Sequence, residues 1–174
     1  REQMLGPDHP DVARGLFALG ALLADLDRLD EAIVAHQRSY AIFTKSLGPR
    51  VHHAANPLLG LGVAMSRKGR YAEAIGHFEQ ALSLLQSSEG GMKNVPLVLR
   101  AQAYAYAQRG VHARALALYE RALAIDEKDL GPDNPAVADD LTGIGRSLLD
   151  MGKPRRALPV LERALRLRDA TPSH

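Results

Sequence analysis

The sequence contains no cysteine and no tryptophan, and only 5% of its residues are aromatic. Without cysteine the chain forms no disulfide, offers no thiolate to a metal and has no cysteine nucleophile. No stretch approaches the roughly 18 consecutive apolar residues that a membrane-spanning helix needs, so we expect no membrane partner. The 22 basic residues exceed the 20 acidic ones by only two. Because so small an excess forms no polybasic surface, we expect no nucleic-acid partner either.

Length and hydrophobic content indicate one folded domain. The chain has 174 residues, of which 46% are hydrophobic and 24% charged, which is typical of a globular domain. It begins with Arg1 rather than methionine, and we expect it to be a fragment of a longer protein. Since no signal peptide opens the chain, we also expect a cytoplasmic location.

Internal repetition is the strongest feature of the sequence. An alanine recurs at steps of 42, 41 and 42 residues: Ala32, Ala74, Ala115 and Ala157. A bulkier residue follows each alanine by four positions: His36, Phe78, Tyr119 and Leu161. A small residue follows each by seven: Ser39, Ala81, Ala122 and Ala164. The segment LGPDHP at 5–10 also returns as LGPDNP at 130–135. Four copies at one period predict a repeat architecture.

Each copy has the pattern of two helices joined by a short turn. In the second copy, apolar residues at helical spacing precede a turn at Gly69, and a second apolar stripe that includes Phe78 follows it. Equivalent turns are predicted at Asp27, Gly110 and Gly152. Glycines inside the first helices, such as Gly62, predict close approach of two helices, with the repeated alanines as the facing small groups. The predicted units are residues 9–50, 51–92, 93–133 and 134–170.

These residues resemble the tetratricopeptide repeat (TPR), a helix–turn–helix unit of about 34 residues. The 42-residue period and the LGPD segment between units are similar to the kinesin-light-chain subtype of that family. The resemblance implies an all-α fold: a right-handed α-solenoid (superhelix) of about four helix–turn–helix units, in a single array over residues 1–174. Similar arrays are attached to bacterial regulatory proteins, including serine/threonine kinases and signalling ATPases. In the LGPD linkers, glycine is expected to end one helix and aspartate to cap the next, with Pro10 or Pro135 near the first turn.

Three places depart from the repeat pattern. His36 and Ser39 are polar where the pattern has an aromatic residue and an alanine, which predicts a looser first unit. Residues 87–94 (SSEGGMKN) lack the proline signature and are predicted to form a mobile loop, for which a plain flexible connection is favoured over a hinge. Pro57 falls early in the second unit, so either its helix starts late with Asn56 as cap or the helix is kinked there.

No motif in the sequence predicts catalysis, and we expect no enzyme activity, no metal and no cofactor. His52 and His53 are the only adjacent histidines among seven. Neighbours on a helix point about 100° apart, and no third ligand lies at suitable spacing, so a structural or solvated role is favoured over metal binding. The glycines around Gly60 lack the preceding strand and third glycine of a dinucleotide fingerprint. The pair Asp139–Asp140 is interpreted as compensation of a helix dipole.

The family resemblance implies that the first helix of each unit lines a concave groove, into which side chains off the core stripe project. The predicted groove residues are Arg14, Phe17, Asn56, Leu59, Val63, Arg67, Arg100, Tyr104, Gln108, Thr142 and Arg146. Their four arginines could form a basic ladder that binds carboxylates in a bidentate manner, although a solvated helix face explains any one of them equally well. Chaperone-binding members of the family clamp a peptide carboxylate with lysine and asparagine side chains. The groove here has one asparagine and no lysine, which favours a peptide or protein segment with acidic and apolar side chains.

The leading functional hypothesis is a non-catalytic protein–protein interaction scaffold. It would hold a peptide or partner domain in the concave groove and belong to a larger signalling protein such as a bacterial serine/threonine kinase. The alternative is a self-assembly module that uses the end faces of the solenoid. A repeat array needs terminal caps with a polar outer face, and no such helix is predicted here, so uncapped ends would expose apolar surface for self-association.

Overall fold

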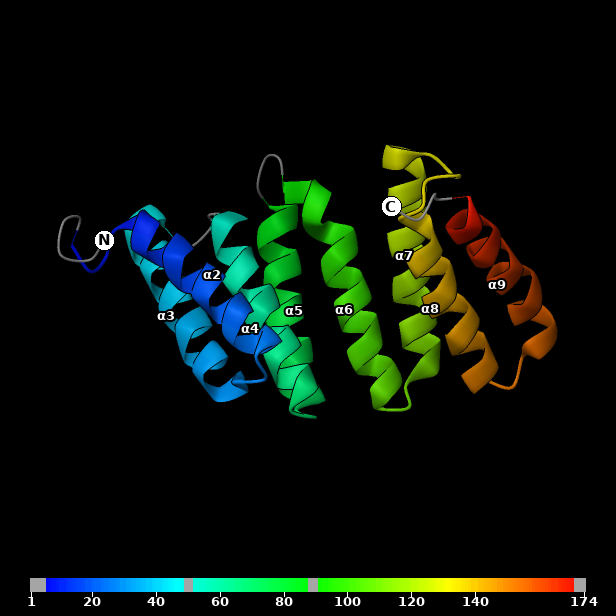
Figure 1. Ribbon diagram of the computed structural model, residues 1–174, viewed down its shortest axis with the longest axis horizontal. Coiled ribbons are helices and arrows are strands. Elements are labelled where there is room, and N and C mark those ends of the chain that lie inside the picture. Colours follow the sequence, from blue (N-terminus) through cyan, green and yellow to red (C-terminus); the bar gives the residue numbers. More distant parts are fainter. Residues whose placement is uncertain (1–5, 49–51, 88–90, 171–174) are drawn as a thin grey trace. The chain divides into compact units, whose positions relative to one another are not determined.

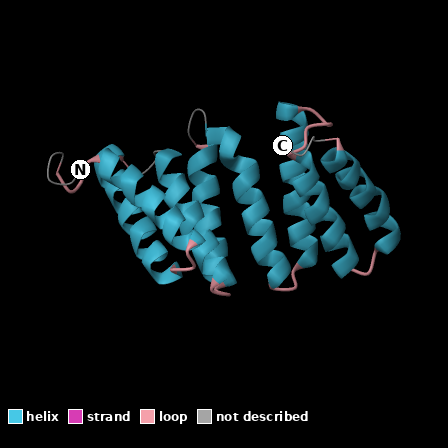
Figure 2. Ribbon diagram, in the orientation of Figure 1, coloured by secondary structure: helices cyan, strands magenta, loops and turns pink. Residues whose placement is uncertain are grey.

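The described residues of the computed structural model, 6–48, 52–87 and 91–170, form helices joined by short turns and contain no strand (Figures 1 and 2). The α-helices are α2 (Pro10–Asp25), α3 (Leu29–Leu47), α4 (Ala55–Arg67), α5 (Tyr71–Gln86), α6 (Val95–Gln108), α7 (His112–Leu130), α8 (Val137–Asp150) and α9 (Pro154–Asp169). Two 3₁₀ helices, η1 (His52–Ala54) and η2 (Gly91–Asn94), precede α4 and α6. The predicted all-α fold is confirmed, and each predicted unit contains one pair of α-helices.

The helices belong to two compact units, residues 1–98 and 99–174, with the boundary inside α6. In the first unit α3 packs against both α2 and α4, and α4 packs against α5. In the second unit α8 packs between α7 and α9. None of the described helices is both long and apolar enough to cross a membrane.

The repeated alanines lie in the core. Ala32, Ala74, Ala115 and Ala157 are all completely buried. Ala32 packs with Leu23 and Ala24 where α2 crosses α3. Ala157 packs with Ile144 and Leu148 where α8 crosses α9. The alanine period therefore identifies the helix crossings, because a larger side chain at such a position would overpack the contact at a cost of about 1–3 kcal/mol.

In three of the four repeats a glycine of the first helix, Gly20, Gly62 or Gly145, faces the bulky residue of the repeat and not the alanine. A Cβ added at Gly62 would overlap the ring of Phe78, and one added at Gly145 would overlap the side chain of Leu161. Phe78 is fully buried. The predicted close approach is present, but the facing group lies four residues beyond the one expected, because the alanine leaves room for the bulky side chain to reach the glycine.

The first repeat uses polar residues at the same core positions. His36 is buried, and its ring lies against Gly20 of α2 and Gly60 of α4, so close that an added Cβ would come within 2.6 Å of it at Gly20 and 2.5 Å at Gly60. Ser39 is also buried, and its Oγ donates a hydrogen bond of 2.8 Å to the carbonyl oxygen of Ala13. Both side chains therefore occupy the core in the manner of their apolar counterparts.

The turns inside the repeats have the predicted left-handed backbone. Gly69, Gly110 and Gly152 have φ values of 74°, 75° and 70°, a region that glycine reaches at no steric cost. Asp27 takes the same place in the first repeat with a φ of 60°, the single positive φ of a non-glycine residue in the described part of the chain. The guanidinium of Arg67, on α4, lies 3.0 Å from its carboxylate and also donates to the carbonyl oxygen of Ala24.

The observed helix starts show that the two predictions of an aspartate cap after LGP were wrong. Gly48 and Gly131 end α3 and α7 as expected, with φ values of 91° and 93°. Asp8, however, does not cap α2: His9 does, and its Nδ1 accepts from the backbone N–H of Asp11 at 3.1 Å. Pro10 is the first residue of α2, as predicted. Before α8, which starts at Val137, it is Asn134 whose side chain accepts from a backbone N–H, that of Ala136.

The late helix start with Asn56 as cap, one of the two alternatives for Pro57, is wrong. The 3₁₀ helix η1 runs directly into α4 at Ala55, so Asn56 is not a cap and Pro57 lies in the first turn. Since the first N–H groups of a helix have no partner inside it, a proline is tolerated there. Of the predicted loop at 87–94, residues 88–90 lie outside the described residues, and residues 91–94 form η2.

Candidate functional site

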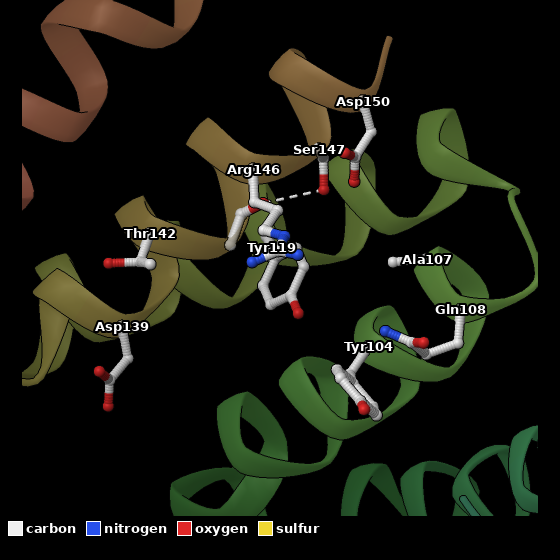
Figure 3. Close-up of a pocket in the computed structure, with 10 residues that line it drawn as sticks. Tyr104, Ala107, Gln108, Tyr119, Asp139, Thr142, Arg146, Ser147 and Asp150 are labelled. Carbon is white, nitrogen blue, oxygen red and sulfur yellow. Dashed lines mark hydrogen bonds between the residues drawn. The ribbon is translucent and has the colours of Figure 1, made fainter. Parts of the chain in front are cut away.

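Four of the predicted groove residues line one cavity of about 510 Å³ in the second unit. They are Tyr104 and Gln108 from α6 and Thr142 and Arg146 from α8 (Figure 3). The other lining residues are Ala107, Tyr119, Asp139, Gly143, Ser147 and Asp150. The α8 residues recur every three or four positions, so they share one face of that helix.

The floor of the cavity includes a tyrosine that sequence reasoning assigned to the core. Tyr119 of α7 lies against Gly143 of α8, where an added Cβ would overlap its ring. Burial raises the pKa of its hydroxyl, with a smaller contribution from the negative charge of Asp140. The sequence did contain one indication that Tyr119 lines a cavity. Its hydroxyl is a polar group that the equivalent residues Phe78 and Leu161 lack.

The charged side chains around the cavity differ in whether they have a neighbour of opposite charge. Arg146 is exposed and forms no ion pair with another residue of the described ranges. Asp139 is paired with Arg168 at 3.0 Å, and the carboxylate of Asp150 lies 3.5 Å from Nδ1 of His112. A guanidinium is thus available beside two tyrosines, whereas the nearest carboxylates each have a cationic or protonatable neighbour.

Two hydroxyls of the cavity are anchored to the helix that carries them. Thr142 donates to the carbonyl oxygen of Ala138 at 2.7 Å. Ser147 donates to that of Gly143 at 2.8 Å, the bond drawn as a dashed line in Figure 3. Each hydroxyl oxygen keeps lone pairs that can accept a hydrogen bond.

Arg100, the fifth predicted groove residue of this unit, does not line the cavity. Its Nη1 lies 2.5 Å from Oδ2 of Asp126 on α7 and 3.2 Å from Oδ1 of Asp140 on α8. Both carboxylates are buried. Burial opposes the charge of Arg100, but its hydrogen bonds and attraction to the two carboxylates prevail and raise its pKa. The guanidinium therefore ties three helices together instead of facing a ligand.

Asp140 is the most perturbed acid of this cluster. Burial raises its pKa to about 7, against the opposing attraction of Arg100 and with a further rise from Asp126. Asp139 and Asp140 both lie in the first turn of α8, as the dipole interpretation requires. Asp139 is exposed, whereas the side chain of Asp140 is fully buried and bound to Arg100. The pair therefore has two different roles that adjacency in sequence did not distinguish.

The six predicted groove residues of the first unit are engaged to different degrees. Arg14 pairs with Asp11 on its own helix, and Arg67 is bound to the α2–α3 turn. Phe17 is partly buried, with its ring centroid 5.7 Å from that of His36. Asn56 and Leu59 are partly buried, and Val63 is exposed. Of the four arginines of the predicted ladder, Arg146 alone forms no ion pair within the described ranges.

Within the described residues there is no group of three or more histidine, aspartate or glutamate side chains placed to hold a metal ion. His53 lies beside Phe43, with ring centroids 6.1 Å apart. The side chain of His52 lies outside the described residues.

Comparisons with known proteins agree with this architecture. A family model described as tetratricopeptide repeat matches residues 11–87 and 95–170. A search of curated proteins found no match. Among solved structures, BtubC (BKLC) from P. vanneervenii superposes with a TM-score of 0.83 at 22% identity, over 95% of this chain and 68% of that one.

Two further solved structures are similar to the chain. A putative kinesin light chain with nearly identical TPR-like repeats, from Podosopora anserina, has a TM-score of 0.75 at 20% identity, over 99% of this chain and 82% of that one. The Rap conjugation gene regulator of plasmid pLS20, in complex with the Phr* peptide, has a TM-score of 0.77 at 18% identity. That likeness covers 93% of this chain and 43% of the regulator. At these identities the likenesses establish the fold alone.

Proposed function

This chain belongs to the tetratricopeptide repeat family, and from that premise we propose that it is a non-catalytic scaffold that binds a peptide or partner domain through the cavity between α6 and α8. Proteins of this repeat family generally act as interaction scaffolds. One solved structure of similar fold, the Rap regulator, was determined with a bound peptide. We further propose that the chain serves as the interaction region of a cytoplasmic signalling protein, such as a bacterial serine/threonine kinase.

The observation that carries this proposal is the free guanidinium of Arg146 beside Tyr104 and Tyr119. A planar guanidinium binds a carboxylate through two parallel hydrogen bonds, and exposed aromatic rings bury apolar side chains at low entropic cost. The cavity therefore suits a segment that places an acidic side chain on Arg146 and an apolar one on the tyrosines. Asp139 and Asp150, on the same face of α8, would repel a second acidic residue on either side.

Peptide selection tests the proposal without knowledge of the natural partner. The purified chain is used to select from a phage-displayed library of short random peptides, and affinities of the selected peptides are measured by isothermal titration calorimetry. We expect sequences that combine acidic and apolar residues. Arg146→Ala should weaken their binding about tenfold or more, as loss of a charge-assisted hydrogen bond does.

Arg156→Ala is the matched control, because Arg156 is likewise an exposed arginine without an ion pair in the described ranges, and it does not line the cavity. Equal affinity of the wild type and the Arg146→Ala variant would refute the site. Selection of peptides without acidic residues would refute the proposed partner chemistry.

Self-assembly through the ends of the array is a second candidate function. Two leucines of α9, Leu158 and Leu165, are exposed although the helix is amphipathic. Exposed apolar groups of this kind mark an interaction surface.

A further inference from the structure

Two residues of opposite charge on α8, Arg146 and Asp150, line the cavity without pairing with each other. They lie four positions apart, a spacing that brings side chains together on one helix face, and both are exposed. Asp150 instead faces the imidazole of His112, which carries charge only when it is protonated. The cavity therefore presents a positive and a negative group about 6 Å apart along the helix axis, and no permanent opposite charge neutralises either of them.

A cation occupies the equivalent place in the first unit. By repeat register Arg67 of α4 is the counterpart of Asp150, which lies 83 residues later. Ala24, in the last turn of α2, is likewise the counterpart of Ala107 in α6. The guanidinium of Arg67 donates to the carbonyl oxygen of Ala24 and to the carboxylate of Asp27. Since the carbonyl end of a helix carries a partial negative charge, a cation is stabilised beside it.

In the second unit the carbonyl end of α6 borders the cavity. Ala107 lines the cavity, and its carbonyl oxygen accepts a hydrogen bond of 2.9 Å from the backbone N–H of Gly110. A carbonyl oxygen has two lone pairs, so it can accept a second hydrogen bond. The carboxylate of Asp150 points from α8 towards the side of the cavity where Ala107 and Gln108 lie (Figure 3). This end of the cavity thus combines a carboxylate with the carbonyl end of a helix.

We propose that this end of the cavity binds a basic side chain of the partner, with arginine preferred to lysine. The inference rests on the proposed function and adds a second charge to the bound segment. The acidic side chain of the segment lies on Arg146, and its basic side chain lies between Asp150 and the carbonyl oxygen of Ala107. Arginine is preferred because one planar guanidinium can donate to a carboxylate and a carbonyl oxygen at once, as that of Arg67 does in the first unit.

Asp139, the other aspartate that lines the cavity, is less suited to this role. Its carboxylate lies 3.0 Å from Nη2 of Arg168, whose guanidinium is a permanent cation. A basic side chain of the partner would have to compete with that guanidinium. At Asp150 it meets only the imidazole of His112.

Peptide selection with an Asp150→Asn variant tests the proposal. From the same random library, the wild-type chain should enrich peptides that carry a basic residue as well as an acidic one. Asp150→Asn should keep the enrichment of acidic residues and lose that of basic ones. Because Asp150 is exposed, we expect the variant to fold, which circular dichroism checks.

Asp129→Asn is the matched control for this selection. Asp129 is an exposed aspartate of α7 that forms no ion pair within the described ranges, and it does not line the cavity. Its replacement should leave both enrichments unchanged. Wild-type selection without a basic residue, or a basic enrichment that survives in Asp150→Asn, would overturn the proposal.

A double-mutant cycle isolates the contact between Asp150 and the basic residue. Calorimetry compares one selected peptide with a copy in which glutamine replaces its basic residue. Asp150→Asn should weaken the binding of the original peptide about tenfold and change that of the glutamine copy less than about twofold. Equal losses for the two peptides would show that Asp150 does not contact the basic residue, which also overturns the proposal.

This inference and the proposed function fail separately. Peptides without a basic residue whose binding is weakened by Arg146→Ala would refute the basic subsite and leave the scaffold function intact. Peptides whose binding neither Arg146→Ala nor Asp150→Asn changes would refute the cavity as the binding site, and both proposals with it. Weakening by Arg146→Ala together with coupling between Asp150 and the basic residue supports both.

Discussion

The two compact units differ in the polar groups that they bury. In the first unit the buried polar side chains are neutral: Ser39 is bound to a backbone carbonyl, and His36 lies between two glycines. In the second unit the buried polar side chains include two carboxylates, Asp126 and Asp140, which form a cluster with the partly buried guanidinium of Arg100. The comparison shows that one repeat pattern accepts either solution, provided that the helices leave space for a neutral ring or supply a countercharge.

The two solutions respond to pH with opposite sign. Burial lowers the pKa of His36 to about 4, so between about pH 6.5 and pH 4 the unfolded state binds more protons than the folded state, and acid destabilises the first unit. Burial raises the pKa of Asp140 to about 7. Between its unfolded pKa of about 3.9 and that value the folded state binds more protons, so the second unit loses stability as the pH rises through 7.

Among the variants considered, Arg100→Met is expected to lower the stability most, because it removes the countercharge of the buried cluster in the second unit. The substitution leaves Asp126 and Asp140 buried without a countercharge, which costs about 3–5 kcal/mol near neutral pH. The cost should shrink in acid, since both carboxyls can then be protonated. Urea unfolding followed by circular dichroism measures it, with Arg156→Met as the matched control. A loss below about 1 kcal/mol would mean that the cluster is hydrated and not a structural tie.

The next largest expected change in stability is the destabilisation of the first unit by acid. Between pH 6.5 and pH 4.5, α2 and α3 should lose about 2 kcal/mol of stability because His36 must accept a proton on unfolding. His36→Leu, which copies Leu161 of the fourth repeat, should abolish the loss. Hydrogen exchange of peptides from α2 and α3, corrected for intrinsic rates, reports the local free energy. Equal acid sensitivity in the variant would assign it to another group.

Asp140→Asn tests the pH dependence of the second unit, which is opposite in sign to that of the first. Raising the pH from 5 to 8 is expected to destabilise α7 and α8 by on the order of 1–2 kcal/mol, because the buried carboxyl of Asp140 must then lose its proton. In the asparagine variant this dependence should be absent, since the side chain does not titrate. The same exchange measurement, applied to peptides from α7 and α8, checks it. A wild-type profile that is flat from pH 5 to pH 8 would contradict the assignment.

The smallest effect is expected from Ser39→Ala. The variant carries the residue that the other three repeats have at this position, yet it removes the buried hydroxyl that donates to the carbonyl oxygen of Ala13. We expect a loss of about 1 kcal/mol in urea unfolding. Ala81→Ser, the converse change in the second repeat, should also destabilise. A gain in stability from Ser39→Ala would show that the hydrogen bond contributes nothing net.

The sequence predicted the core better than it predicted the site. Ala32 and its three counterparts were placed correctly because a strict period of small residues has one physical reading, close packing of helices. Arg100 was assigned to the groove because its partners, Asp126 and Asp140, lie 26 and 40 residues away on other helices. A buried ion pair between helices leaves no periodic trace in one sequence. The His9 cap was missed for a different reason, since histidine is rarely counted among capping residues.

The left-handed turn at Asp27 has a consequence for building longer arrays. Where the other repeats use glycine, the first uses a residue whose carboxylate holds Arg67 of the following repeat. The turn therefore also connects the first repeat to the second through this ion pair. A designer who concatenates copies of the first repeat would also have to replace Asp25, the counterpart of Arg67, by arginine so that each module is linked to the next.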